Sequence, residues 1–255
     1  MNLVNYTVSN AVATIALNRP PVNALNAELI ADIGAALSEA AADDVRAVII
    51  TGIPHFAAGA DIAGFQKAFE SDGDPGLAGS LSAVVAQLES LEKPTIAAIR
   101  GFALGGGLEL AMGADLRYLA DDARVGQPEI LLGIIPGAGG TQRLPRLVGY
   151  QRALEMCMTG RQVDAVEAAE IGLADKVVPV DELFDTAMSD AVEFASGPTA
   201  AYAATKRAVA AGWGTPLDRG LDIEAGEFDH VFATNDARIG VAAFLAKEKP
   251  EFEGR

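Results

Sequence analysis

The sequence has little cysteine, little histidine and few basic residues, and each shortage argues against a class of protein. Cys157 is the only cysteine, so no disulfide framework can form, and we expect a reducing compartment, the cytoplasm. The two histidines, His55 and His230, stand in no metal-ligand pattern, so we expect no metal site. Lys and Arg number 19 against 35 Asp and Glu, a net charge of −16. Nucleic-acid binding needs a basic stripe, so this balance argues against a nucleic-acid partner.

Long uninterrupted apolar runs are also missing. The longest apolar region, residues 95–114, is rich in glycine and is interrupted by Arg100 and Glu109, which indicates buried core and no membrane span. The first ten residues, MNLVNYTVSN, contain no charged segment followed by an apolar one. We therefore expect neither a signal peptide nor a membrane partner.

Several common nucleotide and nucleophile motifs are absent as well. No Gly-x-x-x-x-Gly-Lys-Ser/Thr occurs, so a P-loop is not indicated. The glycine clusters at 101–107 and 137–140 both lack dinucleotide-binding spacing. No Gly-x-Ser-x-Gly elbow is present. The chemistry of this chain has to come from other residues.

The predicted elements follow one another as in an α/β protein, in which ligands sit beyond the strand ends. Residues 65–80 are polar and irregular, which favours a mobile surface segment near a site entrance. We expect one continuous domain, with an α/β core over 1–195 and a helical region over 196–255. Predicted strands lie at 3–9, 11–17, 47–51, 95–99, 115–120 and 176–179. Predicted helices lie at 26–42, 81–91, 141–148, 151–159, 164–171, 181–195, 198–211, 216–234 and 236–247.

Two glycine-rich turns between residues 100 and 140 each stand close to a glutamate among apolar residues. Residues 105–107 are three glycines, and Glu109 follows them; Glu129 precedes the turn that contains Gly137. A glycine run that opens a helix exposes backbone N–H groups able to stabilise an oxyanion, and the 59–60 loop can supply a second donor. Alternatively, the glycines are helix caps, Glu109 is a partly exposed helix residue and Glu129 is a surface glutamate. Together the glutamates can place a water and move its protons.

Five stretches match a known family. They are 17–26 (LNRPPVNALN), 56–62 (FAAGADI), 93–117 (KPTIAAIRGFALGGGLELAMGADLR), 126–149 (GQPEILLGIIPGAGGTQRLPRLVG) and 172–178 (GLADKVV). The chain resembles the crotonase (enoyl-CoA hydratase/isomerase) superfamily over essentially its whole length. The resemblance implies a crotonase-like α/β fold, a spiral of ββα units with a helical C-terminal trimerisation region. It also implies a homotrimer or homohexamer, an acyl-CoA substrate, and no cofactor besides the coenzyme A of that substrate.

The resemblance also assigns roles to residues. The N–H groups of Ala60 and Gly106 would form the oxyanion hole around the thioester carbonyl. Glu109 and Glu129 fall where hydratases of the family keep their catalytic glutamates. A helix opening at Gly137 would place its N-terminal dipole near the site. The residues expected to bind the rest of the substrate, including the CoA adenine, are Ala58, Gly59, Asp61, Ile62, Gly105 and Gly137.

One position departs from the family pattern: many relatives carry a lysine where Ala63 stands. The CoA phosphates must then be bound elsewhere, and the candidates are Lys67, Arg19, or Lys247 and Lys249 of a neighbouring subunit. Phe65 and Phe69 are candidates for bounding the acyl tail.

The presence of both glutamates favours enoyl-CoA hydratase, a hydro-lyase of fatty-acid or related acyl-CoA breakdown. The alternative within the family is a Δ3-Δ2-enoyl-CoA isomerase, which one glutamate can serve as base and acid. An RNA-binding relative is a further alternative, but it depends on a lysine-rich helix that this sequence lacks. A scaffold that binds acyl-CoA without turnover is the last, and the intact glutamates argue against it.

Overall fold

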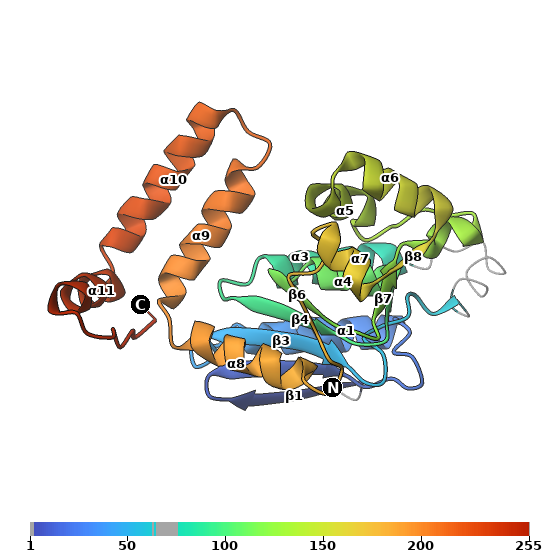
Figure 1. The fold of residues 1–255 in the computed structure, drawn as a ribbon, viewed down its shortest axis with the longest axis horizontal. Coiled ribbons are helices and arrows are strands. Elements are labelled where there is room, and N and C mark those ends of the chain that lie inside the picture. Colours follow the sequence, from blue (N-terminus) through green and yellow to red (C-terminus); the bar gives the residue numbers. More distant parts are fainter. Residues whose placement is uncertain (1–2, 63, 65–75, 255) are drawn as a thin grey trace.

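A six-stranded sheet forms the centre of the molecule. The structure is a computed structural model that describes residues 3–62, 64 and 76–254 (Figure 1). The strand order is β1-β2-β3-β4-β6-β9, in which β1 pairs with β2 antiparallel and all other pairs are parallel. The strands are β1 (Val4–Ser9), β2 (Val12–Leu17), β3 (Ala47–Gly52), β4 (Thr95–Ile99), β6 (Leu116–Ala120) and β9 (Lys176–Val178).

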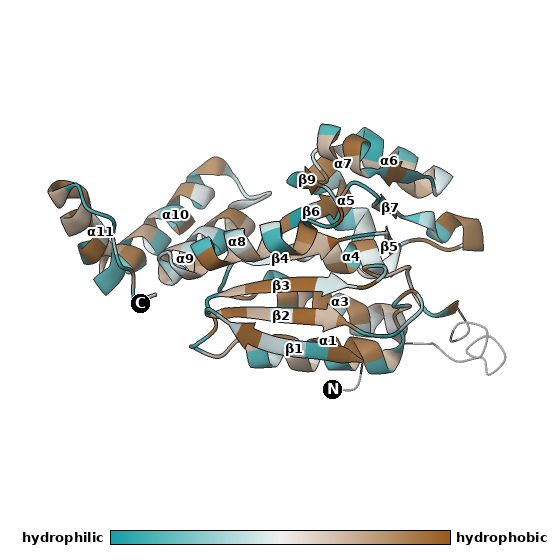
Figure 2. Cartoon of the chain, turned by 60° about the horizontal axis from the view of Figure 1, so that its bottom comes forward, coloured by the Kyte–Doolittle hydropathy of each residue, from teal (hydrophilic) through white to brown (hydrophobic). Residues whose placement is uncertain are grey.

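Helices cover both faces of this sheet, which explains why its central strands are apolar throughout. Every residue of β3 and β4 is buried, and β2 and β3 are mostly apolar in Figure 2. Val48 and Ile50 pack into the larger core with α1 (Ala27–Ala40) and α3 (Leu77–Glu89). Ala47 and Ile49 point to the other face, where α8 (Leu183–Ala195) covers them. The Asn26 side chain caps α1, as predicted, by accepting from Leu29 N at 2.9 Å.

A second, three-stranded sheet carries the glycine-rich part of the chain. Its order is β5-β7-β8, with β5 and β7 parallel and β7 and β8 antiparallel. This sheet is not among the predicted elements, because each of its strands has only three residues, too few for a periodic pattern. The strands are β5 (Phe102–Leu104), β7 (Arg124–Gly126) and β8 (Gln162–Asp164). Around this sheet lie α4 (Gly106–Met112), the 3₁₀ helix η1 (Pro128–Leu132), α5 (Gly140–Val148), α6 (Tyr150–Thr159) and α7 (Ala165–Glu170).

Two predicted helix starts were wrong. The helix expected from residue 81 begins at Leu77, so residues 77–80, predicted to be irregular, are helical. The resemblance implies a helix opening at Gly137, but the helix predicted at 141–148 begins at Gly140, because Gly139 has a φ of +105° and breaks the helical path before it. The remainder of the predicted irregular segment, apart from Gly76, lies outside the described residues.

The last three helices project from the body as an arm (Figure 1). They are α9 (Thr199–Gly212), α10 (Leu217–Phe232) and α11 (Asn235–Ala246), and α9 packs along α10. No residue of α10 is buried, although its surface carries Leu221, Phe228 and Phe232. Of the helices described, none is long and apolar enough to cross a membrane.

Candidate active site

The turn between β5 and α4 requires glycines, because its conformation and its close packing leave no room for side chains. Gly105 has a φ of +52°, in the left-handed region, and its N–H donates to Gly126 O at 2.9 Å. A Cβ on Gly107 would stand 2.1 Å from the carbonyl oxygen of Ala57. The absence of side chains therefore lets α4 begin directly against the loop that follows β3.

That loop is joined to the same turn by backbone hydrogen bonds. Ala57 N donates to Phe102 O at 2.9 Å, and Leu104 N donates to Ala57 O at 3.0 Å. Ala60 forms an isolated bridge with Leu25, in which its own N–H takes no part. Gly106, as the first residue of α4, has no acceptor within the helix. Within the described part of the chain, no acceptor receives either N–H, so both can donate to a ligand oxygen.

Glu109 is buried and held by a backbone turn. Its side chain is part of a residue only 3% exposed. Oε1 accepts from Ala138 N and from Gly140 N, each at 2.7 Å, where the chain turns into α5. Oε2 lies on the side of the glycine run, 3.9 Å from where a Cβ on Gly106 would stand. One carboxylate oxygen is therefore fixed by two donors, and the other is turned toward the glycines.

Glu129 is half-buried on η1 and approaches the same glycines from the other side. Its Oε1 would lie 2.9 Å from a Cβ on Gly105. Gln127 is fully buried, and its amide faces both carboxylate oxygens. Only the NH₂ end of an amide can face two such acceptors, and in that orientation it donates at 2.9 and 3.0 Å. Gln127 is not among the predicted site residues; its only signal in the sequence is its position two residues before Glu129.

Burial raises the pKa of both carboxyl groups, but neighbouring groups oppose the rise more strongly at Glu109 than at Glu129. Burial raises the pKa of Glu109, but the N–H groups of Gly140 and Ala138 and the positive charge of Arg143 oppose the rise. Burial also raises the pKa of Glu129, to about 7, and the negative charge of Glu109 adds to the rise. Near neutral pH the pair can therefore hold one proton, with Glu129 as the protonated member.

Both glutamates and both free N–H groups line one cavity of about 340 Å³. Its wall is mostly apolar, with Leu81, Leu132 and Ile135 among the contributors. Of the residues predicted to bind the rest of the substrate, five line it, namely Ala58, Gly59, Ile62, Gly105 and Gly137.

Asp61 does not line this cavity; its carboxylate pairs with the guanidinium of Arg19 at 2.6 Å. Any contact of Asp61 with a substrate would therefore be made by its backbone. Arg19, one candidate for the CoA phosphates, is engaged in the same ion pair. Among the other positions singled out earlier, Ala63, Phe65, Lys67 and Phe69 lie outside the described residues.

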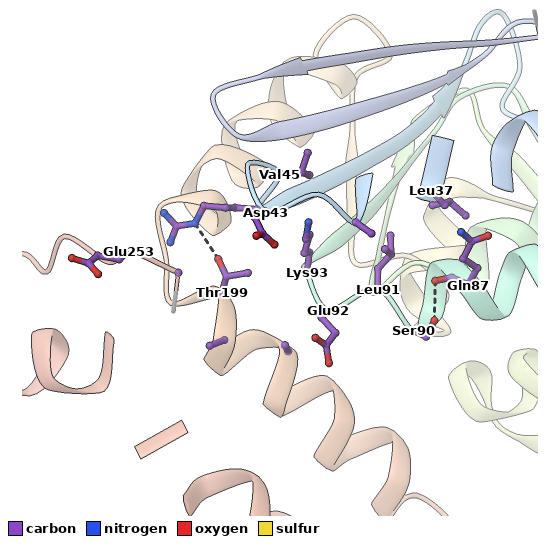
Figure 3. A pocket seen from close by; sticks show the side chains of 15 residues that line it. Leu37, Asp43, Val45, Gln87, Ser90, Leu91, Glu92, Lys93, Thr199 and Glu253 are labelled. Carbon is purple, nitrogen blue, oxygen red and sulfur yellow. Dashed lines mark hydrogen bonds between the residues drawn. The ribbon is translucent and has the colours of Figure 1, made fainter. Parts of the chain in front are cut away.

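A larger cavity, of about 800 Å³, separates the body from the arm but offers no comparable chemistry (Figure 3). Glu92, Lys93, Thr199 and Glu253 line it. The Lys93 ammonium donates to Ala40 O at 2.8 Å and also to Ala42 O, so it caps carbonyl groups at the C-terminal end of α1. The smaller cavity is therefore the candidate active site.

The site combines two backbone N–H groups with two carboxyl groups, an arrangement that can stabilise negative charge on a carbonyl oxygen and move protons. Residues 7–255 match the family model described as enoyl-CoA hydratase/isomerase. The chain belongs to this family, within the crotonase superfamily.

The relatives and solved structures agree with this assignment. The chain is 44% identical to a crotonyl-CoA hydratase of Syntrophomonas wolfei, with 94% of each chain covered. It is 41% identical to a short-chain-enoyl-CoA hydratase of Clostridium acetobutylicum, with 98% of this chain and 97% of the relative covered. The crystal structure of an enoyl-CoA hydratase from Bacillus anthracis superimposes with a TM-score of 0.92, at 37% identity, covering 99% of this chain and 100% of that one. The crotonase fold, with its helical C-terminal region, is confirmed.

Proposed function

We propose that this protein is an enoyl-CoA hydratase that adds water to a trans-2-enoyl-CoA and forms the 3-hydroxyacyl-CoA. The observation that carries the proposal is the arrangement of the site: Glu109 and Glu129 approach one glycine turn beside the free N–H groups of Ala60 and Gly106. A reaction that uses only one carboxyl group would not need both.

The two N–H groups act on the thioester. With its carbonyl oxygen between Ala60 N and Gly106 N, the substrate is polarised, and C3 becomes open to attack by water. Negative charge then develops on that oxygen, where the donors are already in place. One such donor is worth roughly 10²–10³ in rate.

The glutamates divide the proton transfers. Glu109, ionised, orients the water through Oε2 and accepts its proton while the oxygen bonds to C3. Glu129, protonated near neutral pH, delivers a proton to C2 from the same face, so the addition is syn. The raised pKa of Glu129, about 7, supports its role as the acid. Because the two groups interact, they titrate as a pair.

The remaining expectations belong to the same proposal. The enzyme needs no cofactor, because coenzyme A arrives with the substrate. The exposed apolar residues of the arm support a homotrimer or homohexamer assembled through residues 196–255. We place the enzyme in the cytoplasm. The relatives named for crotonyl-CoA and short-chain enoyl-CoA make crotonoyl-CoA the first substrate to test.

The test follows the ultraviolet absorbance of the conjugated enoyl-thioester, with wild type beside Glu109→Gln and Glu129→Gln. We expect rapid loss in the wild type and at least about 100-fold slower loss in each variant. A 3-enoyl-CoA is assayed in parallel, because an isomerase would act on it and retain activity in one of the two variants. A folded wild type that binds CoA and leaves crotonoyl-CoA unchanged would refute the proposal.

A further inference from the structure

One side chain outside the cavity holds the turn that binds Glu109. Arg143, on α5, donates from Nη1 to Ala138 O at 3.2 Å and from Nη2 to Glu89 Oε2 at 2.6 Å. Ala138 is also the residue whose N–H donates to Glu109. The guanidinium therefore links α3 to the turn at residues 138–140, and this turn holds the glutamate.

The turn is shaped to accommodate this guanidinium. A Cβ on Gly139 would stand 2.0 Å from Arg143 Nη1, and the φ of +105° at this residue also favours glycine. The Arg143 side chain is 18% exposed, whereas that of its partner Glu89 is 52% exposed. Arg143 Nε is buried and has no hydrogen-bond partner within the described part of the chain. A surface ion pair alone would not require the arginine to lie this deep.

The titratable and charged groups around Glu109 come from four elements. Glu129 on η1 is negative only after it has lost its proton, and Cys157 on α6 is a neutral thiol near both glutamates. Glu89 on α3 is negative but lies beyond Arg143. Arg143 on α5 is the positive group whose charge acts on Glu109. Its loss would leave the buried carboxylate with only the two backbone donors in its favour.

We propose that Arg143 is a positioning residue for the hydration reaction, which fixes the 138–140 turn that holds Glu109 and sets its own positive charge beside that turn. It touches neither substrate nor reacting atoms, since it does not line the cavity. Only the kinetic part of the test depends on the proposed function being correct. The titration of Glu109 can be measured without turnover.

The test compares Arg143→Met, which keeps most of the side-chain length and removes the charge, with Arg146→Met. Arg146 lies on the same helix and is exposed, and among the described residues it bonds only to Gln142 O, at 2.6 Å. Its replacement by Met makes the same change in net charge. In Arg143→Met we expect the acid limb of the kcat/KM–pH profile to move up by about one pH unit. The ¹³C carboxyl titration of Glu109, assigned by its loss in Glu109→Gln, should move by the same amount. The value of kcat should fall about tenfold, because the turn is no longer fixed.

The inference would be overturned if a folded Arg143→Met kept the acid limb and the Glu109 titration of the wild type. It would also be overturned if Arg146→Met shifted both by the same amount as Arg143→Met. If Arg143→Met does not fold, Arg143→Lys replaces it. A lysine ammonium cannot reach Glu89 and Ala138 O in the two-armed way of a guanidinium, so kcat should fall about tenfold with KM little changed; an unchanged kcat overturns the inference. A wild type that titrates as expected but does not hydrate crotonoyl-CoA would refute the proposed function and leave this inference standing.

Discussion

Glu109 and Glu129 face the same cavity from two differently built parts of the molecule. Glu109 belongs to α4, is 3% exposed, and is bound by two backbone N–H groups. Glu129 belongs to a short 3₁₀ helix, is half-buried, and is bound by the side-chain amide of Gln127. Backbone donors next to a helix end cannot rotate away, whereas an amide side chain can.

The packing around the helices that carry Glu109 and Glu129 also differs. The helix of Glu109 lies on backbone, since a Cβ at Gly107 would meet the Ala57 carbonyl. The helix of Glu129 instead packs through its own side chains on the bare backbone of Gly160, where a Cβ would meet Leu131 Cγ at 3.0 Å and Ile130 Cγ2 at 3.1 Å. Leu131 is itself 71% exposed. One glutamate is therefore held rigidly, and the other has room to adjust.

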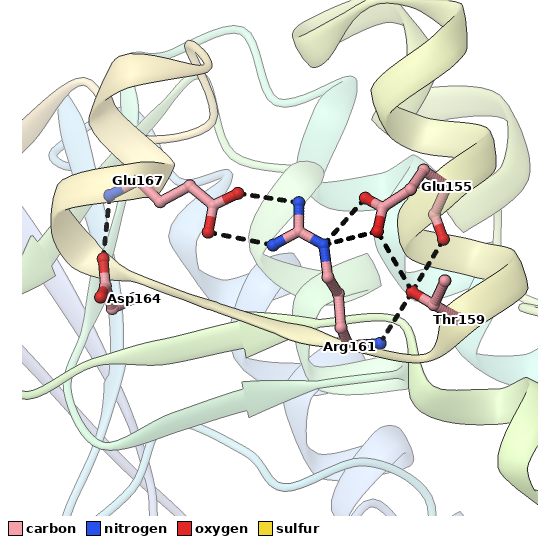
Figure 4. Close-up of polar contacts among 5 residues, drawn as sticks. All are labelled: Glu155, Thr159, Arg161, Asp164 and Glu167. Atoms are coloured by element: carbon pink, nitrogen blue, oxygen red, sulfur yellow. Dashed lines mark hydrogen bonds and ion pairs between the residues drawn. The ribbon is translucent and has the colours of Figure 1, made fainter.

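A polar cluster lies behind the adjustable side (Figure 4). The Arg161 guanidinium contacts Glu155 of α6 at 2.7 Å and Glu167 of α7 at 2.8 Å. It follows Gly160, the residue at the end of α6 that packs against η1. These groups are more than a third exposed, so the cluster adds little stability by itself. Its effect is to fix where α6 ends behind Glu129.

This difference fits the two proposed roles. A base that orients water must remain in place and charged, and Glu109 is held in that way. An acid that gives up a proton and regains it passes through two charge states, and a surrounding that can adjust accommodates both. The comparison makes three predictions, taken from the largest expected effect to the smallest.

The largest effect is a difference in stability between two variants that should both be inactive. Glu109→Leu leaves the buried N–H groups of Ala138 and Gly140 without an acceptor, which we expect to cost about 3 kcal/mol of unfolding free energy. Glu129→Leu leaves the Gln127 amide unpaired but removes a partly desolvated charge, so the net change should stay within about 1 kcal/mol. Urea unfolding at pH 8 and one fixed protein concentration measures both.

The control for this pair is Glu109→Gln, whose side-chain carbonyl can still accept from the turn. It should lose activity like Glu109→Leu but stay close to wild-type stability. Equal losses of stability in Glu109→Leu and Glu129→Leu would show that the two glutamates are held alike, and the comparison would fail.

The next effect is the pH dependence of stability that Glu129 produces. Its pKa is about 7 in the folded protein, against an ordinary value of 4.5. The folded state therefore holds this proton more tightly than the unfolded chain, so the contribution to stability is full below pH 4.5 and is lost as pH rises to 7. Relative to Glu129→Gln, the wild type should lose about 2 kcal/mol between pH 5 and pH 8, after a discount for partial exposure. A difference that does not change over this range would contradict the assigned pKa.

Much of this arrangement could be predicted from sequence because it depends on local features. The buried strands at 47–51 and 95–99 are continuous apolar runs, and the glycine run that precedes Glu109 marks a helix start against bare backbone. The family resemblance added that Glu109 and Glu129 correspond to the catalytic glutamates of hydratases in the family. Their approach to the same glycines agrees with it, while their roles stay predictions.

What the sequence could not provide depends on contacts between distant segments. The strands β5, β7 and β8 exist only because residues 102–104, 124–126 and 162–164 pair with one another. Asp61 stands in a matching motif, yet its carboxylate is taken by Arg19, 42 positions earlier. The turn before α5 depends on Arg143 filling the space beside Gly139. None of these contacts has a periodic or compositional signal.

The smallest effect is predicted for Gln127→Met, which keeps the volume of the side chain and removes its donors. The amide stabilises the charged form of Glu129, so its loss should raise the pKa of Glu129 further and move the basic limb of the kcat/KM–pH profile upward. Because Glu129 also loses its support, kcat should fall about tenfold, equivalent to about 1.4 kcal/mol. Gln142→Met, at an exposed glutamine on α5, is the matched control and should change neither quantity. If Gln127→Met lowers kcat but leaves the basic limb in place, the amide positions Glu129 without changing its pKa, and Glu129 owes its proton affinity to burial and to Glu109 alone.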